Sequence, residues 1–239
     1  MRILCLHGMG TNSKTLGARD ADVYITFLHT VQLSTWIDFI VAALRHQLSH
    51  SQSHIYEYVD GGEPMPPAPG IEAFIGRDES LAYYHPHSAK SILAAIDDLW
   101  EYIAEEGPFE GVLGFSQGAS LAAMIIARAR HSNPPPFQFA IFFCAGLPYC
   151  EKSLSAGEVK FLRAEDTKGP VIHVPTAHIF GKKDPDVNDS KAMIELCHPW
   201  GRVLLDHGAG HEIPRVPVEM VDDMARAVEK VVTKAVIGQ

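Results

Sequence analysis

A serine between two closely spaced glycines is the feature that most restricts how this chain can fold. Residues 111–115 form an apolar run typical of a buried strand, and residues 119–130 have a helix-forming composition without Gly or Pro. Ser116 lies at the junction, between Gly114 and Gly118. Bulkier residues at those two positions would collide with the neighbouring strand and with the helix backbone. The pattern therefore predicts a sharp strand-to-helix turn that presents the Ser116 hydroxyl; the alternative is a glycine-rich turn around an ordinary serine.

The residues downstream of Ser116 offer an acid for it. A serine hydroxyl becomes nucleophilic when a histidine can remove its proton and a carboxylate orients that histidine. Asp184 lies in the loop just beyond the apolar run 177–181, past the carboxyl end of a predicted strand, where open α/β sheets form their sites. We predict that Asp184 is the acid. Asp186 is the second choice in the same loop, and Asp189 is also a candidate cap for the next helix.

The predicted base is His211. Strand 202–206 is followed by a loop in which Gly208 and Gly210 precede His211, so the backbone can carry the imidazole over the edge of the sheet. His207, next to the strand end, is interpreted as a surface or packing residue. The two histidines are four residues apart, but the glycines between them oppose a helix and no H-E-x-x-H motif accompanies them. We expect no metal site and no cofactor.

The amino-terminal strand is expected to complete the site. Residues 2–6 are typical of a buried strand and lead into a loop that contains Gly8 and Gly10. Such a loop can turn a backbone N–H toward the serine, so we predict that the amides of Met9 and Gln117 form an oxyanion hole. The alternative is a plain turn after an edge strand. His7 is interpreted as a structural hydrogen-bonding residue behind the site.

A series of short motifs lies in a specific order along nearly the whole chain: residues 3–8 with Asn12, 59–70, 82–84, 107–111, 114–119, 178–184 and 208–214. With these motifs the chain resembles the FSH-type serine hydrolases, small α/β-hydrolases common in fungi and also found in animals. The resemblance carries the family's triad onto Ser116, Asp184 and His211. It implies esterase or thioesterase activity, including that of fungal members which release polyketide chains from the acyl carrier domain of a synthase.

One segment departs from the family's pattern. In the family the first loop leads within a few residues into the first helix, which here resumes within residues 37–49. Residues 16–36 therefore look like an insertion, either a hydrophobic lid or an error in the gene model.

The alternation of short apolar runs with helical segments predicts a single α/β-hydrolase domain over residues 1–239, with a mostly parallel, doubly wound sheet and helices on both faces. Strands are expected at 2–6, 54–59, 111–115, 138–144, 176–181 and 202–206, and helices at 37–49, 88–105, 117–130, 189–198 and 217–235. The irregular stretches 60–87 and 145–175 follow strand ends on the catalytic side and are the expected walls of a pocket. The side chains expected to line an apolar acyl site are Phe74, Ile75, Tyr83, Tyr84, Leu147 and Tyr149.

Composition argues against several other classes of protein. The formal charge of −9 and the pI near 5.8 oppose broad nucleic-acid binding, which needs a basic surface. The four cysteines show no C-x-x-C spacing and are expected to be reduced. No run reaches the ~18 apolar residues of a membrane span, and the chain opens with a strand rather than a signal segment. We expect a cytoplasmic protein.

These features predict a serine hydrolase that cleaves an acyl ester or thioester through an acyl-enzyme intermediate. By resemblance, the substrate is an acyl or polyketide chain on a carrier domain, whereas a carboxylesterase for small free esters would use the same residues. Residue types at the triad cannot separate these two enzymes. A further alternative is a non-catalytic acyl-binding protein on the same scaffold, favoured if residues 16–36 filled the pocket.

Overall fold

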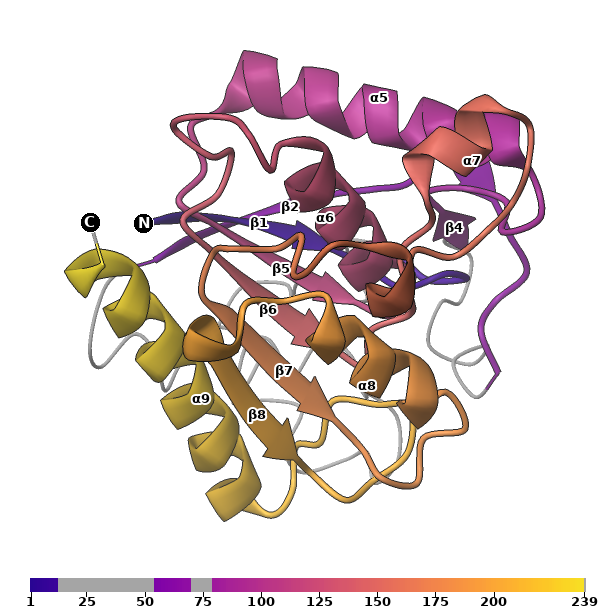
Figure 1. Cartoon of the computed structure of the whole chain (residues 1–239). Helices are drawn as coiled ribbons and strands as arrows, with labels where there is room; N and C mark the ends of the chain where they lie inside the picture. Colours follow the sequence, from indigo (N-terminus) through magenta and orange to yellow (C-terminus); the bar gives the residue numbers. More distant parts are fainter. Residues whose placement is uncertain (13–53, 70–78, 239) are drawn as a thin grey trace.

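The computed structural model describes residues 1–12, 54–69 and 79–238, and their centre is a six-stranded parallel sheet (Figure 1). The strand order is β2-β1-β5-β6-β7-β8, and every neighbouring pair is parallel. The strands are β1 (Arg2–Leu6), β2 (Ile55–Val59), β5 (Gly111–Phe115), β6 (Phe139–Phe143), β7 (Thr176–Phe180) and β8 (Arg202–Asp206). Because all six run the same way, the loops that follow them gather at one edge of the sheet.

Helices cover both faces of this sheet, as the sequence predicts. The helices are α5 (Ala89–Glu106), α6 (Gln117–Arg128), α7 (Glu151–Ser155), α8 (Val187–Glu195) and α9 (Val218–Ile237). Alternate residues of β1 separate the two faces, because successive side chains of a strand point in opposite directions. Leu4 and Leu6 pack in one apolar cluster with residues of α5, α6, α7 and α8, whereas Ile3 and Cys5 pack in a second cluster with α9.

The two stretches predicted as irregular contain short elements. Residues 60–87 include β3 (Glu63–Pro64) and β4 (Leu81–Ala82), which pair antiparallel, and residues 145–175 include α7 and a 3₁₀ turn at Ala164–Asp166. These elements are too short to produce a periodic pattern in the sequence. The insertion at 16–36 and the helix expected at 37–49 lie outside the described residues.

Helix α8 begins at Val187, two residues before the predicted start. Asp184 causes the difference, because its Oδ1 accepts the Asp186 N–H at 2.8 Å and its carbonyl accepts the Val187 N–H at 3.1 Å. The turn after β7 therefore leads directly into the helix. Within the described part of the chain, no helix has the length and apolar character needed to cross a membrane.

Candidate active site

Ser116 lies in the sharp turn between β5 and α6 that the sequence predicts. Its φ of 53° and ψ of −112° are unusual for a residue with a side chain. A Cβ added at Gly114 would lie 2.5 Å from the backbone of Ala119, and one added at Gly118 would lie 2.4 Å from the carbonyl oxygen of Leu6. The two glycines therefore allow β5, α6 and β1 to meet closely around a serine in a strained conformation.

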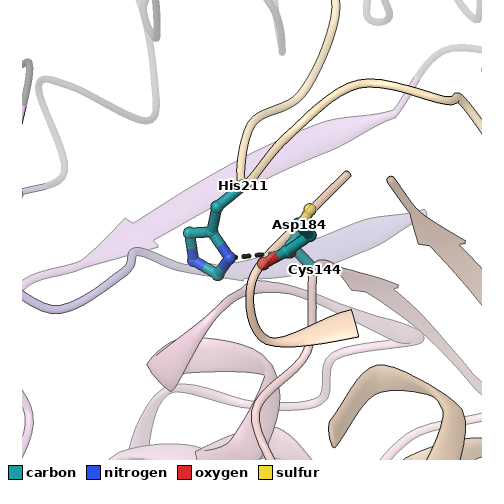
Figure 2. Close-up of side chains that lie close together, drawn as sticks. All are labelled: Cys144, Asp184 and His211. Carbon is teal, nitrogen blue, oxygen red and sulfur yellow. Dashed lines mark hydrogen bonds and ion pairs between the residues drawn. The ribbon is translucent and has the colours of Figure 1, made fainter. Parts of the chain in front are cut away.

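Hydrogen bonds connect the three predicted triad residues. His211 Nε2 lies 2.9 Å from Ser116 Oγ, and His211 Nδ1 lies 2.8 Å from Asp184 Oδ2. The Asp184 side chain is fully buried, whereas that of His211 is 32% exposed. Figure 2 shows the His211 imidazole and the Asp184 carboxylate facing each other. This arrangement fits an imidazole that takes a proton from the serine while the carboxylate holds its Nδ1–H.

Asp184 differs from the other two acidic residues near it, Asp186 and Asp189, in its burial and its hydrogen bonds. Asp186 is exposed and contributes its backbone N–H to Asp184, and Asp189 lies within the first turn of α8. Burial, together with the charges of Asp186 and Asp184, raises the pKa of Asp189. His211 thus has its hydrogen bond with Asp184, the acid ranked first from the sequence.

His207 is buried and its imidazole lies among loop residues, in keeping with its interpretation as a packing residue. Its Nδ1 accepts the Ala209 N–H at 3.3 Å, and burial lowers its pKa. The adjacent backbone is also tied to the sheet, because the His207 N–H donates to the Phe180 carbonyl at 2.9 Å and the Lys183 N–H to the Ala209 carbonyl at 3.0 Å. The loop that carries His211 is therefore anchored to the end of β7.

The loop after β1 lies against the serine. A Cβ added at Gly8 would be 3.4 Å from the Ser116 Cβ. His7 is buried behind this loop, and its Nε2 accepts the Gly61 N–H at 2.9 Å. Since burial lowers the pKa of His7, the ring is neutral and its proton sits on Nδ1, which donates to the Gly8 carbonyl at 2.7 Å. Thr11 Oγ1 donates to the same carbonyl at 2.6 Å.

These two donors fix the orientation of the peptide between Gly8 and Met9. In a trans peptide the N–H points opposite to the C=O. Holding the Gly8 oxygen on the His7 side therefore sets the direction of the Met9 N–H. The neighbouring Gly10 and Thr11 N–H groups both donate to the Leu81 carbonyl, at 2.8 and 3.3 Å, which anchors the loop further.

Gln117 begins α6, so its backbone N–H has no acceptor within the helix. Its buried side chain holds the neighbouring segment, because Oε1 accepts the Tyr83 N–H at 2.9 Å and Nε2 donates to the Tyr84 carbonyl at 3.0 Å. The sequence predicts only a backbone role for Gln117, because nothing in its local pattern indicates this contact over 34 residues.

The side chains expected to line an acyl site are largely buried. Tyr83 donates its hydroxyl to the Val59 carbonyl at 2.6 Å, and Tyr84 contacts Tyr149 edge to face at 5.8 Å between ring centroids. Leu147 belongs to the same apolar cluster as these tyrosines. Contact of an acyl group with any of them stays a prediction; Phe74 and Ile75 lie outside the described residues.

Cys144 joins Asp184 and His211 in the only group of three metal-ligand side chains among the described residues, with ligand atoms within 4.8 Å of one another. The two ligand atoms of Asp184 and His211 are already hydrogen-bonded at 2.8 Å. His211 Nδ1 carries its proton toward the carboxylate and so has no free lone pair for a cation. The hydrogen bond between Asp184 and His211 therefore occupies two of the three ligand atoms in this group.

Comparison with known proteins identifies the family of the chain. Residues 1–220 match the family described as serine hydrolase (FSH1). The chain belongs to this family. It is therefore a serine hydrolase, as the motifs indicated.

Among relatives of the chain, Esterase FPY3 of Fusarium mangiferae is 84% identical over 239 residues, which cover 100% of both chains. Hydrolase phiM of Talaromyces stipitatus is 27% identical over 249 residues, covering 96% of this chain and 87% of the relative. A solved carboxylesterase from Mesorhizobium loti superposes with a TM-score of 0.56 at 15% identity, covering 95% of this chain and 88% of that one. The structural likeness confirms the predicted α/β-hydrolase fold.

Proposed function

We propose that this serine hydrolase is an esterase whose catalytic residues are Ser116, Asp184 and His211. Ser116 Oγ attacks the acyl carbonyl carbon while His211 Nε2 takes the hydroxyl proton. His211 then gives that proton to the departing alcohol or thiol, and the acyl group remains bonded to Ser116 Oγ. Water then attacks the acyl-enzyme, again giving its proton to His211, and the acid product leaves with Ser116 restored.

The Met9 and Gln117 backbone N–H groups stabilise the negative charge on the carbonyl oxygen in this proposal. Two observations support the pair. The Gln117 N–H is free of a helical partner, and the Gly8 carbonyl is held by His7 and Thr11 so that the Met9 N–H has a fixed direction. Neither donor has to reorient when charge develops, which is the condition for effective electrostatic stabilisation.

The observation that carries the proposal is the unbroken chain of hydrogen bonds from Ser116 Oγ through His211 to the buried Asp184 carboxylate. A fluorophosphonate probe tests it, because the probe reacts with a serine whose hydroxyl is activated. We expect labelling at Ser116 and none in Ser116→Ala. Ser120→Ala is the matched control, since Ser120 is a buried serine of α6 whose hydroxyl donates to the Leu147 carbonyl. Labelling or full hydrolytic activity in Ser116→Ala would overturn the proposal.

The proposed substrate is an acyl thioester of medium or greater length, carried in the cell on an acyl carrier domain in secondary metabolite biosynthesis. This proposal for the substrate rests on the family resemblance and on cationic side chains in residues 145–175, among them Lys160 and Arg163. An acidic carrier would be repelled by a chain of net charge −9 unless cations lay near the site. Arg163 is exposed and close enough to Asp189 to favour its charge, whereas Lys160 pairs with Asp166 at 3.4 Å. A cytoplasmic location suits such a substrate and stays a prediction.

Thioester and oxygen-ester series built on the same acyl chain separate this proposal from a carboxylesterase of small free esters. After correction for intrinsic leaving-group reactivity, we expect a higher kcat/KM for the thioesters. Arg163→Glu should raise KM for a carrier-bound thioester but not for the free one. Arg226→Glu, on α9, is the matched charge control. A preference for oxygen esters would favour the carboxylesterase.

A further inference from the structure

Two buried titratable side chains, Cys144 and His207, lie beside the Asp184–His211 pair. Figure 2 shows Cys144 next to the Asp184 carboxylate. The Cys144 sulfur, a carboxylate oxygen of Asp184 and a ring nitrogen of His211 are within 4.8 Å of one another. Cys144 is 1% exposed, so this contact is shielded from solvent. The mechanism proposed above uses neither Cys144 nor His207.

The backbone holds Cys144 between the segments that carry the triad. Cys144 follows β6 and has a φ of 43°, a left-handed conformation that is uncommon for a residue other than glycine. Its N–H donates at 2.9 Å to the Ile179 carbonyl in β7, the strand that leads to Asp184. The preceding carbonyl, of Phe143, accepts the Ser116 N–H at 2.9 Å. The thiol is thus fixed relative to both the nucleophile and the acid.

The thiol also contacts the His211 loop on both sides of His211. Cys144 Sγ lies 3.4 Å from the Glu212 carbonyl oxygen, which it can reach as a donor, and 3.8 Å from His207 Nε2. Because His207 Nδ1 accepts the Ala209 N–H, the proton of this neutral ring sits on Nε2 and points to the sulfur. His207 donates to the thiol and the thiol donates to Glu212.

The charge state of Cys144 agrees with a donor role. Burial and the neighbouring Asp184 carboxylate raise the pKa of the Cys144 thiol. The sulfur therefore keeps its proton at neutral pH, and the side chain acts as an S–H donor rather than as a nucleophile.

We propose that Cys144, oriented by His207, is a positioning residue that holds the His211 loop against Asp184. The inference rests on the proposed function of Ser116, Asp184 and His211. Such a contact restrains the His211 loop, whose backbone has conformational freedom at Gly208 and Gly210 and whose His211 side chain is partly exposed. A small displacement of a catalytic group is costly to the reaction even when the fold is intact.

Cys144→Ala removes the S–H donor, and Cys144→Ser replaces it with an O–H donor. We expect kcat to fall about tenfold in the alanine variant with KM nearly unchanged, and to stay within about threefold in the serine variant, as for loss and retention of one ordinary hydrogen bond. Cys197→Ala is the matched control. Cys197 is a buried cysteine whose thiol donates to the Met193 carbonyl at 3.6 Å, just after α8. Its replacement should lower the melting temperature without changing kcat.

An Asp184→Asn background separates positioning from general loss of packing. If Cys144 acts through the Asp184–His211 pair, Cys144→Ala should cost little more once Asp184 has been replaced. A tenfold loss that persists in the Asp184→Asn background, or equal losses in the alanine and serine variants, would overturn the inference. Cys144→Gly tolerates the positive φ and replaces the alanine variant if that protein does not fold. Activity that survives in Ser116→Ala would instead refute the proposed function, so the two failures are distinguishable.

Discussion

Replacing Asp184 by asparagine should abolish most of the activity by changing the tautomer of His211. In Asp184→Asn the amide oxygen remains at the Oδ1 position, because it must accept the Asp186 N–H that now lies 2.8 Å from Oδ1. The NH₂ group then faces His211 Nδ1, which can only accept from it. A neutral His211 must therefore carry its proton on Nε2, where it cannot take the proton of Ser116.

The size of the loss follows from this inversion. The corresponding change in another enzyme with such a triad lowers kcat about 10⁴-fold, or about 5 kcal/mol of transition-state stabilisation. We expect a loss of this order here, because the Asp184 side chain is fully buried and water has no access to replace its carboxylate. The free energy of unfolding should change by less than this loss of transition-state stabilisation, because asparagine has the same shape as aspartate.

Steady-state hydrolysis of an activated ester measures the effect, with the melting temperature as a check of folding. Asp186→Asn and Asp189→Asn are the controls, and each should retain most of the wild-type kcat/KM. A folded Asp184→Asn variant that keeps more than about a tenth of the wild-type kcat would refute the role assigned to Asp184. A larger loss of kcat in Asp186→Asn than in Asp184→Asn would indicate that Asp186, two residues further on, is the catalytic acid.

Four other substitutions concern histidines. His211→Ala should remove activity, and His207→Ala should cost no more than about tenfold, which kcat measurements on both variants check; the reverse order would refute the assignment of the base. His7→Phe keeps an aromatic ring against Tyr83 but loses the donor to the Gly8 carbonyl, so kcat should fall about tenfold to a hundredfold with little change in KM; an unchanged kcat would show that the Met9 N–H needs no such support. Burial lowers the pKa of His178 to about 3, below its unfolded value near 6.5, so the unfolded chain binds the extra proton between these pH values. The free energy of unfolding should therefore decrease as pH falls from about 6.5 to 3, by up to about 1.4 kcal/mol per pH unit from this residue. Urea denaturation of wild type and His178→Gln across that range should show a weaker pH dependence in the variant, and equal slopes would contradict the assignment.

The sheet and the grouping of Ser116, His211 and Asp184 were predictable because their signals are local. Strands such as β5 are short apolar runs, and the glycines beside Ser116 have a steric reason that holds wherever a strand turns sharply into a helix. The order of serine, acid and base along the chain then restricted the choice to a few residues. Asp184 could be ranked first because, of the three acids, it lies nearest in the sequence to the end of β7.

The contacts around the triad could not be predicted, because they join residues distant in the sequence. The Gln117 amide reaches Tyr83 across 34 residues, and Cys144 reaches Glu212 across 68. Neither contact has a periodic or compositional signal. The start of α8 was misplaced by two residues for a similar reason, because the hydrogen bond that Asp184 Oδ1 accepts from the Asp186 N–H, rather than helix propensity, determines it.

The strand order has a consequence for synthesis of the chain. Ser116 emerges from the ribosome before His211, the proposed base, which follows β8, the strand at the end of the strand order and the last strand to be made. Without the loop after β8, Ser116 has no base, and its hydroxyl is an ordinary alcohol. A nascent or truncated chain that ends before residue 211 thus carries the nucleophile in an inert form. Under the proposed assignment, turnover of an ester begins only when β8 and the loop after it have assembled, so hydrolysis reports the assembly of this edge of the sheet.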